Sequence, residues 1–415
     1  MNIERDKLHE LVERFSREET QYTSGNSGFS ETETRTEYID PLFSCLGWDI
    51  NNEEGLTNSL KDVVREENQP FDETSRRPDY TFRIAGQRQY FVEAKKPSVD
   101  IRIHSASAYQ VRRYGWTAGL SISILTNFRH LRIYDTRFAP DNHDDADAGL
   151  LLTLRYADYE SHLERLLSII GREAVAKGSI DKEWSRETKP SVPASLDFQN
   201  KLNRWRIEIA RNLHSRYPDY DLDSINDVAQ MVINRFLFIR MCEDRGLEGE
   251  DTLKTTVHRR DAVELNKLFR TLDRRYNTGL FNTDRDPLQA SIQIDSTVLT
   301  TIVDELYRPK TPYDFSVLDA DFLGQVYEQS LRKRLSLNAS GDMVFVDKPA
   351  YEGREVITTP QPIVDELIRR TVRGRFSEDP WRIRKSADIS ELTRTKILDM
   401  AVGSGRFLVR SLEEL

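Results

Sequence analysis

The sequence has 415 residues, of which 38% are hydrophobic and 31% charged, and a formal net charge of −9 at pH 7. The length predicts two or three folded domains, and the negative charge argues against a non-specific DNA coat while still allowing a local basic groove. No run of about 18 apolar residues is present and the N-terminus is charged, so neither a transmembrane helix nor a secretion signal is expected. Cys45 and Cys242 both lie in apolar helical patterns and are expected to be reduced core residues of a cytoplasmic protein.

Two helices are predicted at the start of the chain. Apolar residues recur at helical spacing over residues 2–17, and a second helix is expected from about 33 to 46, with Gly47 as its stop. The stretch 20–32 between them is rich in Ser, Thr and Gly and therefore predicts a loop.

An alternation of strands and a helix follows. β-rich runs predict strands at 80–84 and 89–93, with a turn starting at Ala85-Gly86, then a helix at 104–114 and strands at 120–126 and 130–134. This order of helices, strands, helix and strands predicts a small α/β layer fold in the first third of the chain.

The remainder of the chain changes texture twice. Residues 180–195 carry two prolines and mixed charge and predict a linker, whereas strand signals are nearly absent from 196–335, where long helical periods dominate. An apolar strand is expected at 396–399, leading into a Gly-Ser-Gly turn and a helix. The sequence thus predicts a first domain at 1–150, a linker with a helix at 151–194, a helical connector at 195–350 and a last domain at 351–415.

Charged residues cluster where the first two predicted strands would meet. Asp79 follows Pro78 at the start of one strand, and Glu93 and Lys95 stand on the next, on one face of it because strand side chains alternate. Two carboxylates on neighbouring strands can hold Mg²⁺, which prefers oxygen ligands and lowers the pKa of a bound water. A nearby lysine can position that water or stabilise developing negative charge. The alternative interpretation is that these are exposed strand-end charges.

This Pro-Asp and Glu-x-Lys pattern resembles the PD-(D/E)xK nuclease superfamily, in particular the N-terminal nuclease domain of type I and type IIG restriction enzymes. The resemblance implies a Mg²⁺ site made of Asp79, Glu93 and Glu37, the last on the second helix. It also implies a QxxxY pair, Gln110 and Tyr114, which would align the site or touch the DNA backbone. Taken singly, Glu37, Gln110 and Tyr114 fit an exposed helix face equally well.

A second set of motifs lies near the C-terminus. The apolar run before Gly403-Ser404-Gly405 enters a turn in which glycines permit positive φ and close approach of a ligand. It resembles motif I of S-adenosylmethionine-dependent DNA adenine-N6 methyltransferases, with Met400 in place of the usual proline and Val402 in place of the usual cysteine. The resemblance implies that the cofactor is bound by Thr359, Pro360, Asp399, Ala401, Gly403 and Gly405.

Some parts of such a methyltransferase are not found in the sequence. The Asn/Asp-Pro-Pro-Tyr/Phe tetrapeptide that holds a flipped adenine is absent, and the chain stops one predicted helix after Gly405. We therefore expect a fragment of a larger enzyme, a split subunit or a truncated gene, with target recognition supplied by a second chain or a further C-terminal region.

The sequence as a whole resembles the N-terminal portion of a type IIG-like restriction–modification enzyme. The expected fold is a PD-(D/E)xK α/β domain, a mainly α connector and the start of a Rossmann-like methyltransferase domain. The expected activity is Mg²⁺-dependent cleavage of double-stranded DNA, with an incomplete S-adenosylmethionine site. One alternative is a non-catalytic DNA-binding or assembly subunit of a restriction or phage-defence system, and another is a methyltransferase half that needs its missing part.

Overall fold

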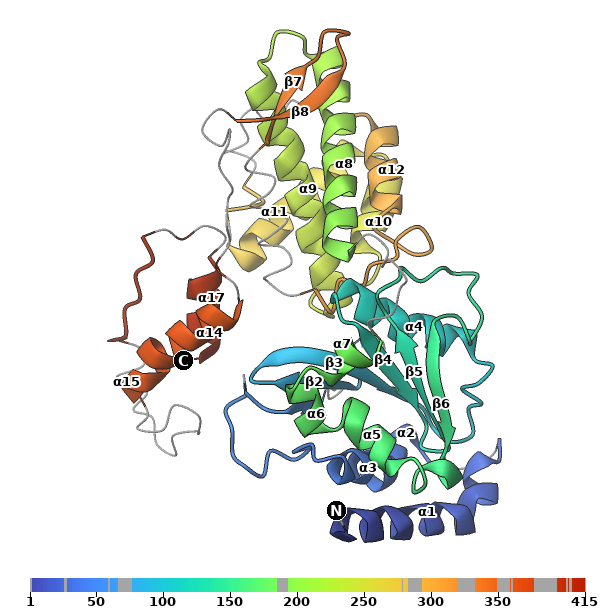
Figure 1. Cartoon of the computed structure of the whole chain (residues 1–415). Coiled ribbons are helices and arrows are strands. Elements are labelled where there is room, and N and C mark those ends of the chain that lie inside the picture. Colours follow the sequence, from blue (N-terminus) through green and yellow to red (C-terminus); the bar gives the residue numbers. More distant parts are fainter. Residues whose placement is uncertain are drawn as a thin grey trace. The chain divides into compact units, whose positions relative to one another are not determined.

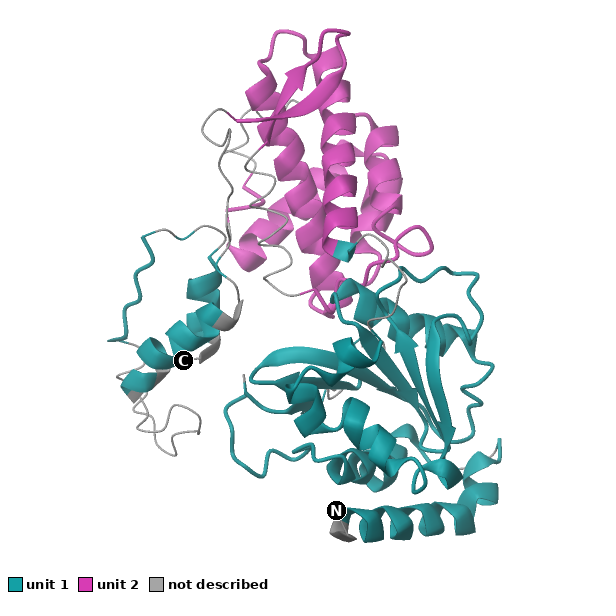
Figure 2. Cartoon of the chain, viewed as in Figure 1, with its two compact units in different colours: residues 1–67, 77–194, 359–415 teal, residues 68–76, 195–358 magenta. Residues whose placement is uncertain are grey.

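Figure 1 shows the computed structural model of the chain. Contacts divide the chain into two compact units, one made of residues 1–67, 77–194 and 359–415 and the other of 68–76 and 195–358 (Figure 2). Among the described residues, no helix is long and apolar enough to cross a membrane. The structure describes residues 2–25, 28–58, 60–65, 77–184, 193–277, 279–282, 293–318, 333–348, 359, 361–376, 394–400, 402 and 405–414.

A six-stranded sheet in the order β1-β2-β3-β4-β5-β6 forms the centre of the first unit (Figure 1). Neighbouring strands are antiparallel except β3 and β4, whose parallel pairing requires the crossover helix α4 (Ser105–Thr117). The predicted strands and helix of this region are confirmed, while β1 and β6 were not predicted. The strands are β1 (Val63–Arg65), β2 (Tyr80–Ile84), β3 (Gln87–Ala94), β4 (Ile122–Thr126), β5 (His130–Asp135) and β6 (Leu150–Arg155).

The turn between β2 and β3 matches its sequence signal. Ala85 and Gly86 have φ of 50° and 82°, the positive values that a tight two-residue hairpin turn with the twist of its strands requires. The turn pairs Ile84 with Gln87, and a β-bulge between Phe82 and Arg83 shifts the register by one residue, so turn and bulge together decide which end residues face each other.

The N-terminal helices differ from prediction at their boundaries. Helix α1 (Asn2–Thr23) continues into the expected loop, and the second helical segment begins at Glu31, because Ser30 and Glu33 form a capping box. That segment consists of α2 (Glu31–Thr34), the π-helical turn η1 (Arg35–Ile39) and α3 (Asp40–Cys45).

Helices cover both faces of the sheet. The main core joins α1, α3 and α5 (Leu163–Ile170) to one face, and a smaller cluster including Ala108, Val111 and Leu125 packs α4 on the other. The unit continues past residue 150, where the sequence analysis ended the first domain. The reason is that β6 pairs with β5, and α6 (Arg172–Ala176) and α7 (Ser179–Glu183) add side chains to the main core.

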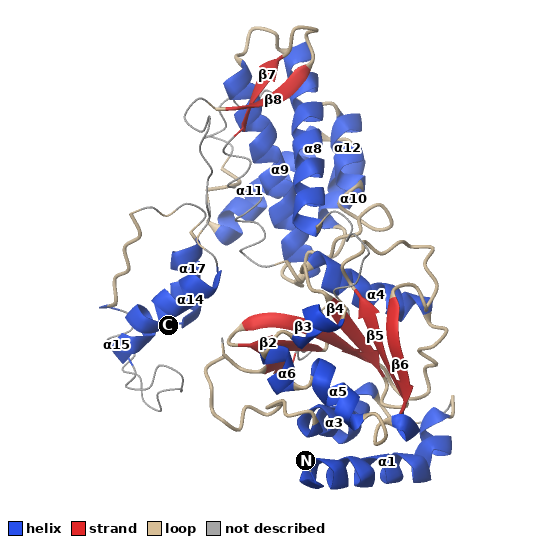
Figure 3. Cartoon of the chain, viewed as in Figure 1, coloured by secondary structure: helices blue, strands red, loops and turns tan. Residues whose placement is uncertain are grey.

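The second unit is mainly helical, as predicted (Figure 3). It also contains a hairpin of β7 (Lys333–Leu337) and β8 (Met343–Asp347), which the sequence analysis did not predict. Its helices are α8 (Ala194–Arg216), α9 (Leu222–Asp244), α10 (Thr252–His258), α11 (Ala262–Tyr276) and α12 (Ser296–Asp304).

A buried polar network holds the end of α9. The Arg240 guanidinium pairs with Glu243 and Asp244, and Tyr307 Oη donates to Glu243 Oε2 over 2.7 Å. All three charged side chains are at most 4% exposed, so each needs its partners to offset the loss of water. The charged residues at the end of α9 therefore stabilise the packing of this unit.

The C-terminal segment contains α14 (Gln361–Ile368), η5 (Arg369–Arg373), α15 (Gly374–Phe376) and α17 (Arg406–Glu414). The helix expected after the glycine turn is confirmed, and Phe407 packs against Val364 and Ile368. The strand expected at 396–399 is not formed: among the described residues no strand pairs with it, and a lone strand leaves its amide and carbonyl groups without partners.

Candidate functional site

The register of the β2–β3 hairpin brings Asp79 and Glu93 together. Tyr80 pairs with Val92 and Thr81 with Phe91, so continuing the ladder by one residue puts Asp79 opposite Glu93. Residues directly opposite in an antiparallel pair carry their side chains on the same face. The Ala94 amide donates to Asp79 Oδ2 over 2.7 Å, which fixes the aspartate at this end of the hairpin.

Two cations and a further acid complete the cluster. Lys95 Nζ donates to Glu93 Oε1 over 2.7 Å and to the Ala94 carbonyl over 2.9 Å. Arg35 Nη1 donates to Asp79 Oδ1 over 2.9 Å. Glu31 Oε2 lies 3.8 Å from Lys95 Nζ. We call Glu31, Arg35, Asp79, Glu93 and Lys95 the hairpin-end cluster.

Burial controls the charge states in this cluster. Glu93 is 3% exposed, and burial together with the negative charge of Asp79 raises its pKa to about 8, although Lys95 opposes the shift. Burial acts to lower the pKa of Lys95, but the charges of Glu93 and Glu31 outweigh it and the pKa rises. Lys95 is therefore held as a cation beside a carboxyl that is costly to ionise.

The composition of the cluster suits a divalent cation. With all three carboxyl groups ionised, its two cations leave one negative charge in excess, and Glu93 Oε2 is buried without a hydrogen-bond partner. Such an oxygen is a natural ligand for a hard cation such as Mg²⁺. In the described part of the chain, no group of three acidic, His or Cys side chains is arranged to hold a metal ion. In the cluster, Arg35 and the Ala94 amide donate to Asp79, and Lys95 donates to Glu93 Oε1.

The acid of the helical segment that reaches the cluster is Glu31. The side chain of Glu37 is exposed, and its main-chain carbonyl accepts a hydrogen bond from Arg14. Glu31 was not predicted as a site residue, because the Ser/Thr/Gly-rich composition of residues 20–32 predicted a loop. The Ser-x-x-Glu spacing of Ser30 and Glu33 is the signal that would have placed Glu31 in the first turn of a helix. The contribution of Glu37 to metal binding stays a prediction.

The QxxxY pair lies on the face of the sheet that carries Glu93. Gln110 Nε2 donates to Tyr114 Oη over 2.8 Å, and the buried Tyr114 ring packs edge-on against Phe91 with centroids 6.5 Å apart. Phe91 and Glu93 are two residues apart on β3 and share a face. Helix α4 therefore supports the strand that ends in the hairpin-end cluster.

The second set of motif residues is only partly described. Pro360, Ala401 and Gly403 lie outside the described residues. Arg406 Nη1 donates to the Thr359 carbonyl over 2.5 Å, so the threonine segment and the start of α17 meet. Gly405 has φ of 80° and its amide donates to the Val402 carbonyl over 2.7 Å, which closes a tight turn before the helix.

Asp399 belongs to the same region, in a stretch that forms no strand and is followed by Met400, 93% exposed. Of the expected strand–turn–helix the helix is therefore present here, but the strand that would carry Asp399 toward a cofactor is not.

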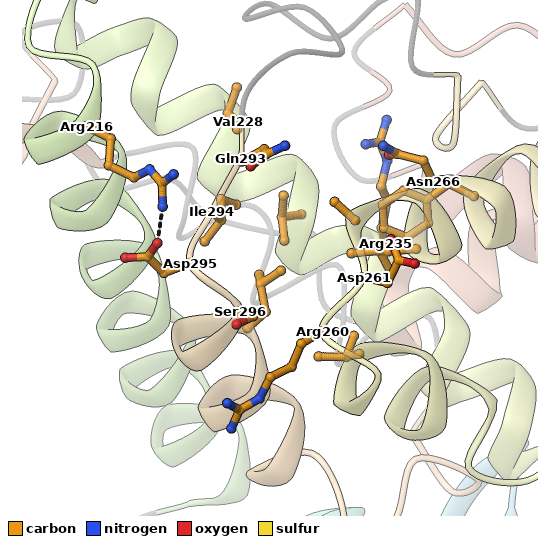
Figure 4. A pocket seen from close by; sticks show the side chains of 16 residues that line it. Arg216, Val228, Arg235, Arg260, Asp261, Asn266, Gln293, Ile294, Asp295 and Ser296 are labelled. Carbon is orange, nitrogen blue, oxygen red and sulfur yellow. Dashed lines mark hydrogen bonds and ion pairs between the residues drawn. The ribbon is translucent and has the colours of Figure 1, made fainter.

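A cavity of about 330 Å³ lies in the helical unit, lined by residues of α8, α9, α11 and α12 (Figure 4). Arg216 pairs with Asp295, and Arg235 Nε donates to the Leu280 carbonyl over 2.8 Å while its guanidinium stacks on Phe269. These two arginines are already engaged by protein groups. The hairpin-end cluster, with its unpaired buried oxygen, is the stronger candidate for chemistry.

Comparison with known proteins identifies the class to which the relatives of this chain belong. No family model matches the sequence. The curated proteins that it resembles over almost its whole length are fusions of a type II restriction enzyme with a methyltransferase. This confirms the kind of protein that the two sets of motifs predicted.

Two relatives and one solved structure define the match. The chain is 33% identical to the type II restriction enzyme and methyltransferase RM.Eco57I of Escherichia coli, over 99% of this chain and 40% of the relative. It is 23% identical, over 92% of its length and 39% of the relative, to the putative type II restriction enzyme and methyltransferase RM.MjaORFECS2P of Methanocaldococcus jannaschii. The type IIG restriction endonuclease BpuSI matches 91% of this chain and 37% of that chain, with 14% identity and a TM-score of 0.27. The chain spans about two fifths of the length of the curated relatives.

Proposed function

We propose that this chain carries the Mg²⁺-dependent endonuclease portion of a type II restriction–modification enzyme and acts on double-stranded DNA. The observation that supports the proposal best is the pairing of Asp79 and Glu93 across the hairpin, with Lys95 hydrogen-bonded to Glu93 and the second Glu93 oxygen buried and unpartnered. A strand-end carboxyl without a function would be expected to face water, whereas Glu93 is only 3% exposed.

The residues of the cluster divide the work of phosphodiester hydrolysis. Asp79 and Glu93, assisted by Glu31 or Glu37, would hold the metal, which when bound supplies a water of lowered pKa and charge for the phosphate oxygens. Lys95 stays protonated between Glu93 and Glu31 and places its positive charge where negative charge develops on the phosphate. Gln110 and Tyr114 keep α4 against β3 and so hold the end of the strand in place.

Metal titration and DNA cleavage by the full chain test this proposal. Asp79→Ala should lose both Mn²⁺ binding and Mg²⁺-dependent cleavage, because a ligand is gone. If Asp79→Ala and the wild type bind Mn²⁺ equally weakly and neither cuts DNA, the chain is instead a non-catalytic DNA-binding or assembly subunit. The pairing of Asp79 with Arg35 and Ala94 is the observation that favours this second candidate, because it leaves the aspartate satisfied without a metal.

We further propose that residues 359–415 form part of an S-adenosylmethionine site for adenine-N6 methylation. The contact between Arg406 and the Thr359 carbonyl supports this, since it joins two motifs that are distant in sequence. The chain alone should bind the cofactor poorly, because the stretch containing Asp399 forms no strand. Calorimetric titration with S-adenosylmethionine checks this expectation, and binding in the micromolar range would contradict it.

A further inference from the structure

The ion pair between Arg35 and Asp79 has a consequence for metal binding, given the nuclease function proposed above. Arg35 Nη1 lies 2.9 Å from Asp79 Oδ1, and the Ala94 amide lies 2.7 Å from Oδ2. Both oxygens of the aspartate are therefore used by donors of the protein. Lys95 instead donates to Glu93 and to a main-chain carbonyl, and none of its described hydrogen bonds goes to Asp79.

A divalent cation and the Arg35 guanidinium compete for the same oxygen. Mg²⁺ binds carboxylate oxygens at roughly 2.0–2.1 Å, so a guanidinium on the same oxygen would face a like charge at short range. Even with all three carboxyl groups ionised the cluster has only one negative charge in excess, so adding two positive charges would make it positive. The Ala94 amide belongs to β3 and stays in place, so the arginine is the group that can move.

The backbone of Arg35 is held in place, while its side chain is partly exposed. Arg35 is the first residue of the π-helical turn η1, and Tyr38 and Ile39 of the same turn are completely buried. The side chain of Arg35 is 20% exposed and that of Asp79 is 15% exposed. π-helical turns inserted in α-helices are frequent at functional sites. A guanidinium released from Asp79 thus remains next to the cluster and in contact with solvent.

We propose that Arg35 exchanges Asp79 for a phosphate of the DNA when the divalent cation binds, so that metal binding and DNA binding are coupled through this residue. A guanidinium presents paired donors that match phosphate oxygens, and the exchange replaces one charge-assisted partner with another. Arg35 is a positioning residue in this scheme. It keeps Asp79 neutralised without a metal and holds the DNA backbone with one.

The test compares Arg35→Gln with Arg137→Gln in the full chain. Arg137 pairs with Asp135 over 2.6 Å and has a similar exposure of 23%, but the strand register places Asp135 opposite Ile122, at the other end of the sheet. Mn²⁺ affinity is measured by titration without DNA. Affinity for a DNA duplex is measured by fluorescence anisotropy, with Ca²⁺ present and with chelator.

Arg35→Gln should bind Mn²⁺ several-fold more tightly than the wild type, because the competitor is gone. Its DNA affinity in Ca²⁺ should fall about tenfold, the usual effect of losing a charge-assisted contact. The gain in DNA affinity that Ca²⁺ gives the wild type should shrink correspondingly. Arg35→Lys keeps a positive charge beside Asp79 but loses the paired donors of the guanidinium. It should therefore bind Mn²⁺ like the wild type and DNA more weakly. Arg137→Gln should match the wild type in both assays.

Two results would overturn the exchange. If Arg35→Gln binds Mn²⁺ more weakly than the wild type while melting normally, Arg35 only supports Asp79. If it binds Mn²⁺ and DNA as Arg137→Gln does, the residue plays no part in coupling. In both cases the wild type still binds Mn²⁺ and cuts DNA, so the nuclease proposal survives. A wild type that does neither overturns both ideas. If Arg35→Gln does not fold, the Arg35→Lys measurements decide.

Discussion

The hairpin end and the C-terminal segment both carry sequence motifs, but in the described part of the chain only the motif at the hairpin end lies within a paired sheet. At the hairpin end, Glu93 lies on β3 and Asp79 and Lys95 directly flank β2 and β3, strands that belong to a six-stranded sheet with helices on both faces. In the C-terminal segment, the stretch before Gly405 pairs with no described strand, and Leu398 is 83% exposed. A motif fixes the geometry of its side chains only where its strand has neighbours to take up the backbone hydrogen bonds.

The largest expected effect tests the hairpin-end cluster, which is the region within the paired sheet. Lys95→Ala should reduce Mg²⁺-dependent cleavage by about 10²–10³-fold, the range seen when a group that stabilises transition-state charge is removed. Metal binding should persist, because Asp79 and Glu93 remain. The measurement is single-turnover cleavage beside Mn²⁺ titration.

The neighbouring Lys96, which is exposed, offers a matched control for this experiment. Lys96→Ala should cut DNA within about threefold of the wild-type rate. Equal rates for Lys95→Ala and the wild type would show that the hairpin-end cluster is not the catalytic site, and the assembly-subunit function would then explain the chain better.

Two leucines compare the packing of the two regions directly. Leu125 on β4 is completely buried, whereas Leu398 is mostly exposed. Leu125→Ala should lower the free energy of unfolding by about 2–5 kcal/mol through lost burial and a cavity, and Leu398→Ala by less than about 0.5 kcal/mol. Chemical denaturation of the full chain measures both. An equal loss at Leu398 would mean that its stretch is packed like the sheet.

A smaller effect sharpens the description of the hairpin end. Glu31→Gln should weaken Mn²⁺ binding by about tenfold, because Glu31 adds negative charge next to Lys95 within the cluster. Glu37→Gln, at an exposed position two residues before the end of the segment's π-helical turn, should change it by less than about twofold. The reverse order would restore the assignment made from the sequence.

The sequence was sufficient where short-range signals and burial agree. Strands β2 to β5, helix α4 and the turn at Ala85-Gly86 follow from alternation and turn chemistry. Strand β1 has three residues and β6 is mostly half-exposed, so neither gives a strong pattern, and both form because the sheet offers an edge to pair with. The opposite error occurred at 396–399, where an apolar pattern has no partner among the described strands.

The residues of the candidate site that belong to the hairpin could be predicted from the sequence, whereas those from the preceding helical segment could not. Asp79, Glu93 and Lys95 lie at one end of a hairpin whose strands and turn were predicted, whereas the bulge that puts Asp79 opposite Glu93 was not. Glu31 and Arg35 reach the cluster from a helical segment more than 40 residues earlier in the sequence, through the fold of the whole unit. No spacing rule gives such a contact, and the pairing of Arg35 with Asp79 therefore emerges only from the three-dimensional structure.

The smallest expected effect concerns acid stability of the sheet. His130 at the start of β5 is 6% exposed, and burial, with Arg102 and Arg129 nearby, lowers its pKa to about 4, while an unfolded histidine titrates near 6.5. A group whose folded pKa is depressed is protonated preferentially in the unfolded chain, so its neutral form stabilises the fold above pH 6.5 and that contribution is lost as the pH falls toward 4. Allowing for incomplete burial, lowering the pH from 7 to 5 should reduce the free energy of unfolding by about 1 kcal/mol through this residue.

His130→Gln should remove that part of the pH dependence of the melting temperature, whereas His143→Gln, at an exposed position, should leave the dependence as in the wild type. If both variants follow the wild-type curve, His130 does not titrate differently in the folded and unfolded states, and the buried end of β5 must tolerate a charged imidazole.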